Sequence, residues 1–126
     1  MLVLDSGGFG RLSERSKQAL ALIEEFRTAG LWPPVVPTMV LVESLQGHAG
    51  RDANANRFLK TVIKDDAVSL EVARRAAELR RLARHGSAVD AFVVAVAEPS
   101  GIVLTGDEAD ITALAAVSKG VTVELV

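Results

Sequence analysis

The chain has 126 residues, 49% hydrophobic and 24% charged, a composition that predicts a single globular domain over residues 1–126. Its 14 basic and 16 acidic residues give a formal net charge of −2, which argues against nucleic-acid binding through a uniformly basic surface. There is no cysteine and there are two histidines, which excludes a disulfide framework and a zinc site rich in Cys or His. The longest apolar run, Ala91 to Ala97, is too short for a membrane span, and no signal peptide precedes the first strand. We therefore expect a cytoplasmic protein without a membrane partner.

The N-terminal third predicts a strand, a turn and a helix. The segment from Leu2 to Leu4 is a short buried strand that ends at Asp5, and the glycine pair after Ser6 is expected to turn the backbone away. Ser13 is the expected N-cap of a helix over about residues 14–29, whose apolar residues recur at helical spacing.

The middle of the chain predicts a second strand at residues 35–36 and a helix from Thr38 to about Gln46. This helix is apolar at nearly every position and is expected to be mostly buried, so the carboxylate of Glu43 needs a partner. A polar loop, a short helix ending near Lys60 and a strand with a turn in residues 61–70 come next.

The C-terminal half alternates helices and strands again. The pattern predicts helices over residues 71–85, 87–98 and 108–118, and strands over residues 102–104 and 121–126. The strands are nearly all apolar rather than alternating, as expected when both faces of a sheet are covered. The sequence therefore predicts an α/β sandwich around a parallel sheet.

Four acidic residues are expected at one edge of this sheet. Asp5 and Asp107 follow strands, Asp90 lies in the first turn of a helix that precedes a strand, and Glu43 lies in a helix that follows one. If the strands are parallel, all four carboxylates converge on the carboxyl edge, where open α/β sheets bind ligands. Close carboxylates repel one another, and a hard divalent cation, Mg²⁺ or Mn²⁺, removes that repulsion.

Each of these acids also has a purely structural explanation. Ser87 with Asp90, and Thr105 with Glu108, match capping boxes, and Asp107 is favoured near a helix N-terminus. Asp5 fits an Asx turn at a strand exit. The conjunction of four acids on one edge favours a functional role for them.

Other charged residues have no such placement. Asp52 and the Asp65–Asp66 pair are expected on the solvated surface. The arginines of the helix at 71–85 are interpreted mainly as a solvated face, with a phosphate-binding patch as the alternative; they are Arg74, Arg75, Arg80, Arg81 and Arg84.

In order and spacing, these motifs resemble the PIN-domain ribonucleases, and more narrowly the VapC-type toxins of bacterial toxin–antitoxin pairs. The resemblance covers the whole chain and rests on the first strand ending in Asp5-Ser6, "VLVESL", "AVDAFVVAVA" and "VLTGDEADI". Gly7 stands where many members have a hydroxyl or an asparagine, and Ile111 where an aromatic residue is frequent.

The resemblance implies a three-layer α/β/α sandwich with a central, mainly parallel sheet of four to five strands. It implies an endoribonuclease dependent on Mg²⁺ or Mn²⁺, with a catalytic quartet of Asp5, Glu43, Asp90 and Asp107. Of these, Asp5, Asp90 and Asp107 are the implied metal ligands, and Glu43 positions the attacking water. Ser6 and Thr105 supply hydroxyls to the substrate site, Asp110 is a candidate fifth acid, and a homodimer and an antitoxin whose tail covers the site are the implied partners.

Two other functions compete with this interpretation. One is a PIN-like interaction module whose acids no longer bind metal. The other is a phosphatase that forms an aspartyl-phosphate on Asp5. Phosphatases of the haloacid dehalogenase family carry a second acid two residues after the nucleophile, and Gly7 occupies that position here.

Overall fold

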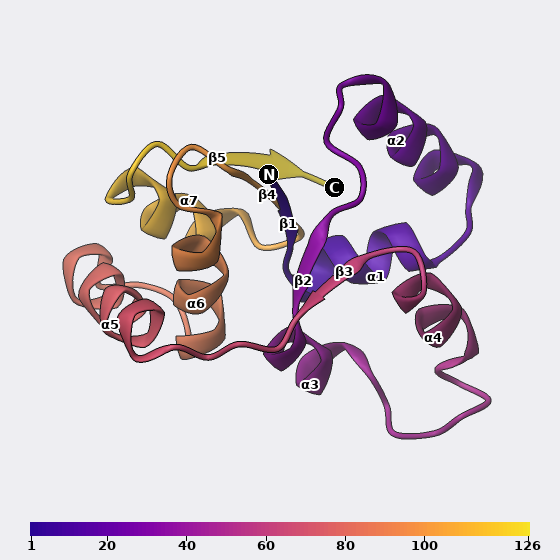
Figure 1. Ribbon diagram of the computed structural model, residues 1–126, viewed down its shortest axis with the longest axis horizontal. Coiled ribbons are helices and arrows are strands. Elements are labelled where there is room, and N and C mark those ends of the chain that lie inside the picture. The colour runs from indigo at the N-terminus through magenta and orange to yellow at the C-terminus, as the bar shows by residue number, and fades with distance from the viewer.

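Five parallel strands form one central sheet in the computed structural model, which describes residues 1–126 (Figure 1). The strand order is β3-β2-β1-β4-β5, so β1 lies in the middle with β2 on one side and β4 on the other. The strands are β1 (Leu2–Leu4), β2 (Val35–Pro37), β3 (Ile63–Asp65), β4 (Ile102–Thr105) and β5 (Thr122–Leu125). The predicted α/β class and the parallel sheet are confirmed.

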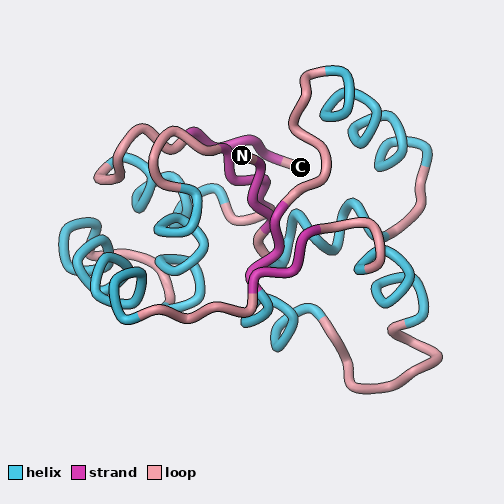
Figure 2. Tube along the Cα trace, viewed as in Figure 1, coloured by secondary structure: helices cyan, strands magenta, loops and turns pink.

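Helices cover both faces of the sheet, which gives the three layers visible in Figures 1 and 2. On one side lie α1 (Ser6–Ser13), α2 (Lys17–Thr28), α3 (Leu41–Ser44) and α4 (Ala53–Leu59). On the other side lie α5 (Leu70–Ala83), α6 (Ala88–Ala97) and α7 (Glu108–Ala116). A single 3₁₀ turn, Thr38–Val40, joins β2 to α3. None of these helices is long and apolar enough to cross a lipid bilayer.

The two faces of the sheet bury separate hydrophobic cores. Because successive residues of a strand point to opposite faces, Val3 and Val103 pack against α5, α6 and α7, whereas Leu4 and Leu104 pack against α1, α2 and α4. The second core also contains four aromatic residues, Phe9, Phe26, Trp32 and Phe58, and Phe9 and Phe58 form an edge-to-face pair at 5.5 Å between ring centroids. Burial on both faces explains why the strands are apolar throughout.

The structure corrects the prediction for the segment after β1. Helix α1 stands where a turn was expected at Gly7 and Gly8, and the helix expected over residues 14–29 is confirmed as α2 but begins later, at Lys17. Ser13 ends α1 rather than capping the next helix, and the N-cap of α2 is Ser16, whose Oγ accepts a hydrogen bond from the Ala19 N–H at 3.1 Å. The expected Gly30 terminus is confirmed, with φ of +75°.

The helix predicted from Thr38 to about Gln46 is also shorter and more exposed than expected. It consists of the 3₁₀ turn and α3, which ends at Ser44, and the side chain of Val42 is 83% exposed. The chain then leaves the helix because residues 45–52 form a loop held by the buried carboxylate of Asp52. This carboxylate accepts hydrogen bonds from the N–H groups of Gln46, Gly47 and His48. The expectation of a solvated Asp52 is therefore wrong, since its side chain is 6% exposed.

Gly8 is required by the close approach of α1 to β4. A Cβ at this position would lie 2.2 Å from the carbonyl oxygen of Leu104, whereas a Cβ at Gly10, in the same helix, would meet nothing within 4 Å. We expect Gly8→Ala to lower the free energy of unfolding by about 2 kcal/mol, because the helix must move off the strand. Gly10→Ala should raise it by about 0.5–1 kcal/mol through helix propensity. Urea denaturation measures both changes, and equal effects of the two substitutions would contradict this account.

Candidate functional site

Asp5 connects the central strand to the first helix. Its Oδ1 accepts a hydrogen bond from the Gly8 N–H at 2.8 Å, so the carboxylate is the N-cap of α1. Its Oδ2 accepts a hydrogen bond from the hydroxyl of Thr105, the last residue of β4. Asp5 and Thr105 are 4% and 0% exposed. Asp5 is thus fixed at the carboxyl end of β1 by contacts to two different elements.

Thr105 extends this connection to the next acid. Its Oγ1 accepts a hydrogen bond from the Asp107 N–H at 2.8 Å, and Asp107 is the N-cap of α7, accepting from the Asp110 N–H at 3.3 Å. The hydroxyl predicted as a substrate contact is therefore buried and engaged by Asp5 and Asp107. Its role in this structure is to hold these two residues together at the edge of the sheet.

Asp90 belongs to the capping box predicted for α6. The Ser87 Oγ accepts a hydrogen bond from the Asp90 N–H at 3.1 Å, and Asp90 Oδ2 accepts one from the Ser87 N–H at 3.0 Å. The structural explanation of Asp90 is thus confirmed. Its Oδ1 takes no part in the capping box and is therefore available to a ligand.

Three carboxylates gather at this edge. One oxygen each from Asp90, Asp107 and Asp110 lie within 4.8 Å of one another. Asp90 and Asp107 were predicted to meet, and Asp110, named as a candidate fifth acid, joins them. Asp110 follows Asp107 by three residues, so the first turn of α7 places both side chains on the same side of the helix. We call these three residues the acidic cluster.

Asp5 adjoins the acidic cluster. Burial raises the pKa of the Asp5 carboxyl above its ordinary value, and the negative charge of Asp90 raises it further. Hydrogen bonds from the Gly8 N–H and the Thr105 hydroxyl act in the opposite direction but do not cancel the rise in pKa. The site therefore brings negative charges together without enough positive charge to balance them.

Glu43 is not brought into the acidic cluster. It lies in α3, with its side chain exposed to solvent rather than buried as expected from its apolar neighbours. The helix α3 packs against α1, so Glu43 is positioned on the side of the sheet opposite α6 and α7. Ser6 is the first residue of α1 and is half-buried beside Asp5.

The donor set fits a hard divalent cation. All three members of the acidic cluster offer carboxylate oxygen, the ligand type preferred by Mg²⁺ and Mn²⁺, and no cysteine exists in the chain. One imidazole is near, because His85 Nδ1 lies 3.8 Å from Asp110 Oδ1. Asp90, Asp107 and Asp110 would hold the cation, and Asp5 would lie next to it.

One buried carboxylate outside the site, that of Glu98, was not predicted from the sequence. Glu98, at the C-terminus of α6, accepts two hydrogen bonds from the Arg75 guanidinium at 2.7 and 2.8 Å, and one from the Lys119 N–H at 2.6 Å. The Arg75 guanidinium lowers the pKa of Glu98 below its ordinary value. Arg75 is therefore a structural residue that ties α5 to α6, and not part of a solvated face as expected.

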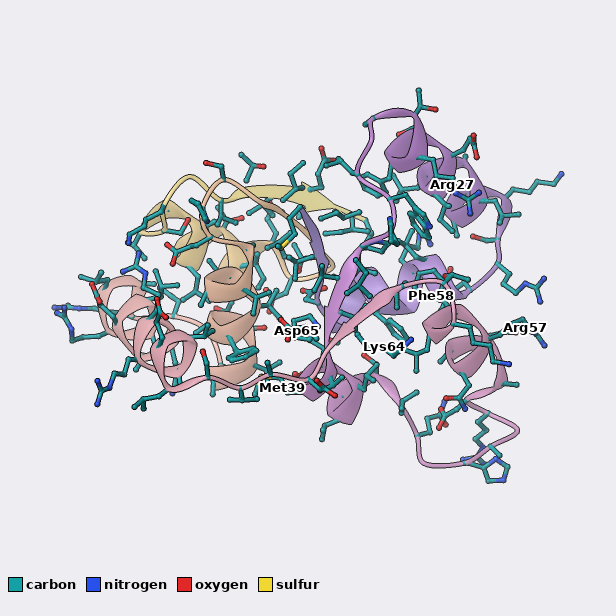
Figure 3. The ribbon with its side chains drawn as sticks, viewed as in Figure 1. Arg27, Met39, Arg57, Phe58, Lys64 and Asp65 are labelled. Atoms are coloured by element: carbon teal, nitrogen blue, oxygen red, sulfur yellow. The ribbon has the colours of Figure 1, made fainter.

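A hollow on the other side of α1 has a different character. It has a volume of about 340 Å³ and lies between α1, α2 and α4. Its lining is apolar at Leu12, Trp32 and Phe58, and Arg27 and Arg57 extend around it from α2 and α4 (Figure 3). The guanidinium of Arg27 stacks over the Trp32 ring at 5.3 Å. This hollow contains aromatic and cationic groups but shares no residue with the acidic cluster.

Comparison with known proteins gives no relative for this chain: no family model matches it, and no curated protein matches its sequence.

We expect the acidic cluster to bind Mn²⁺. Asp107→Asn and Asp110→Asn should each weaken Mn²⁺ binding by more than about tenfold, since even residues that only support metal ligands contribute that much. The matched control is Glu108→Gln, which removes one charge from the same helical turn but from a residue outside the cluster. Isothermal titration with MnCl₂ measures the affinities. Equal weakening by all three substitutions would show that net charge alone attracts the ion.

We also expect Asp5→Asn to stabilise the metal-free protein at neutral pH. The folded-state pKa of Asp5 is raised, so its contribution to stability is present at acidic pH and is lost as the pH rises through that pKa. The asparagine keeps an oxygen for the Gly8 N–H without the charge. Its Nδ2 can donate to the Thr105 hydroxyl oxygen in place of the bond that the hydroxyl donates to Asp5, and the hydroxyl then donates to the Asp107 carbonyl oxygen, 3.4 Å away. Thermal unfolding in EDTA should therefore show a higher Tm for the variant at pH 7 and a smaller difference at pH 4. A variant that melts below wild type at pH 7 would contradict this assignment.

Proposed function

We propose that this protein is an endoribonuclease dependent on Mg²⁺ or Mn²⁺, of the PIN-domain type and similar to VapC toxins. The observation that carries the proposal is the acidic cluster of Asp90, Asp107 and Asp110, with Asp5 beside it at the carboxyl end of β1. In this sheet the strand order changes direction between β1 and β4, the position where open α/β sheets bind ligands. The order of the motifs that resemble that family supports the proposal further.

The residues divide into two groups by their geometry. Asp90, Asp107 and Asp110 each keep an oxygen close to a common point, which suits them to hold a divalent cation. When bound, the cation supplies a positive charge beside the scissile phosphate and an acidified water. Asp5 and Thr105 join β1 to β4 and to the start of α7, so they fix the position of Asp5 relative to Asp107, a member of the acidic cluster.

Glu43 is proposed to orient the attacking water, as the family resemblance implies. Its exposed position on α3 leaves the carboxylate free to contact a bound strand, and it lies across the sheet edge from α6 and α7. A substrate phosphate seated between these elements would have the acidic cluster on one side and Glu43 on the other. Ser6, at the start of α1, would contact the same strand.

The partners are proposed on the same resemblance. We infer a homodimer and an antitoxin whose tail covers the acidic site, which would make this chain the toxin of a pair. The hollow between α1, α2 and α4 supports such a partner, because its apolar floor and arginine rim suit an amphipathic segment that carries acidic residues. An antitoxin segment bound in this hollow would leave the acidic cluster free to be covered by the antitoxin's tail.

The test incubates purified protein with total RNA and MnCl₂. Wild type should cleave RNA, and Asp5→Asn or Asp90→Asn should slow cleavage by about a hundredfold or more, the loss seen when one group that stabilises a transition state is removed. Glu43→Gln should slow it by a factor of about 10²–10⁴ if the carboxylate acts on the attacking water. Glu108→Gln is the control and should retain activity.

Other outcomes would identify the competing functions. Unchanged cleavage in Asp5→Asn and Asp90→Asn would remove these acids from the mechanism. A protein that neither binds Mn²⁺ nor cleaves RNA would be an interaction module. A phosphoenzyme trapped on Asp5 would indicate a phosphatase.

A further inference from the structure

A basic hollow lies at the C-terminal end of α5. It has a volume of about 550 Å³ and is lined by Arg80, Arg81, Arg84, His85 and Gly86, without an acidic or hydrophobic residue. The three arginines are exposed, and none forms an ion pair with a carboxylate. By contrast, Arg75, earlier in the same helix, is paired with both Glu78 and Glu98. The hollow therefore holds three guanidinium charges that the protein itself does not neutralise.

The basic hollow borders the acidic cluster directly. The carbonyl oxygen of Gly86 accepts a hydrogen bond from Arg80 Nε at 3.3 Å, and a Cβ built on Gly86 would lie 3.5 Å from the Cβ of Asp90. On the other side, His85 Nδ1 lies 3.8 Å from Asp110 Oδ1. Residues 84–87, which connect α5 to α6, thus have the arginines on one side and two members of the acidic cluster on the other.

A structural role accounts for part of this arrangement. Basic residues near a helix C-terminus interact favourably with the helix dipole. That role does not explain Arg84, which occupies the left-handed conformation, with φ of +56°, at a position where glycine is the favoured residue. An arginine here adds a cation to the hollow in a backbone conformation that a side chain disfavours.

We propose that this basic hollow binds a phosphate of the RNA strand, adjacent to the phosphate that reaches the acidic cluster. The inference rests on the proposed function and adds to it the residues that position the substrate. Guanidinium groups match the geometry of phosphate oxygens and bind them through two parallel hydrogen bonds. Arg81 and Arg84 are thus positioning residues, since phosphate contacts fix the register of a strand without reading its sequence.

The electrostatics of the whole chain require such a surface. The net charge is −2 and the acidic cluster repels a phosphodiester, so binding energy for RNA must come from a local concentration of positive charge. The basic hollow borders the cluster and provides that charge. A strand held there would pass next to Asp90 and Asp110, the two members of the acidic cluster that adjoin His85 and Gly86.

The experiment compares two double variants with the same change in charge. Arg81→Gln/Arg84→Gln alters the basic hollow, whereas Arg51→Gln/Arg74→Gln removes two exposed arginines elsewhere, Arg74 being on the same helix. Binding of a fluorescein-labelled single-stranded RNA is followed by anisotropy in EDTA, where no cleavage occurs, at several NaCl concentrations. The hollow variant should bind the RNA about tenfold more weakly than wild type. A plot of log K for RNA binding against log salt concentration should become less steep, by about 0.7 for every phosphate that the variant no longer neutralises.

A third variant separates RNA binding from folding. Arg84→Gly removes the guanidinium and relieves the left-handed backbone, so its Tm should equal or exceed that of wild type while its RNA affinity falls. In the cleavage assay, the hollow variants should raise KM with little change in kcat. Loss of affinity that is equal in the two double variants, or an Arg84→Gly variant that binds RNA as wild type does, would overturn the inference.

The outcomes also distinguish this inference from the proposed function. If wild type cleaves RNA and the basic hollow has no effect on binding, the nuclease proposal stands and the inference fails. If wild type binds RNA through the basic hollow but does not cleave it in Mn²⁺, the inference stands and the nuclease proposal fails.

Discussion

The hydrogen bonds of Thr105 are the constraint on which the site depends. Its hydroxyl donates to the Asp5 carboxylate and accepts from the Asp107 N–H, so one buried side chain fixes the ends of β1 and β4 and the start of α7. These two strands have no short connection along the sequence, and their pairing alone does not orient the helices α1 and α7 that begin after them. Because Thr105 and Asp5 are both buried, their hydrogen bond is shielded from water. The separation between α1 and α7 is thereby set by a buried contact and not by flexible loops.

The cost of this arrangement is electrostatic. Asp5 is buried next to Asp90, and burial together with that charge raises the pKa of its carboxyl even though two hydrogen bonds favour ionisation. The three carboxylates of the acidic cluster lie close together, and no arginine or lysine forms an ion pair with any of them. Without a cation, the ionised carboxylates repel one another and lower the stability of the folded protein. A bound divalent cation would relieve this repulsion and stabilise the folded protein. Sites with a functional role commonly carry such a loss of stability.

The sequence predicts the parts of this structure that depend on hydrophobic periodicity. It does not predict the segments whose conformation depends on a single tertiary contact. Apolar runs such as Leu2 to Leu4 indicated buried parallel strands, and acids after them indicated a common edge. Helix α1 was missed because three glycines in Ser6 to Gly10 have low helix propensity. The helix forms because Asp5 caps it and Phe9 and Leu12 are buried, and Gly8 is needed for contact with β4. Likewise, the exposure of Glu43 and the burial of Asp52 depend on a loop path that periodicity does not describe.

Capping and metal binding are complementary explanations of the same acids. Asp5 and Asp107 cap α1 and α7, and Asp90 completes the capping box of α6, so each acid is explained locally. Capping alone does not require a charge, since serine, threonine and asparagine cap about as well as aspartate. Helices α2 and α5, which contribute nothing to the acidic cluster, are in fact capped by the neutral Ser16 and Ser69. Aspartates are thus placed at the helix starts that meet at the carboxyl edge, where their mutual repulsion is greatest. Under the proposed function, a bound cation would offset this repulsion, in addition to the favourable interaction of each aspartate with a helix N-terminus.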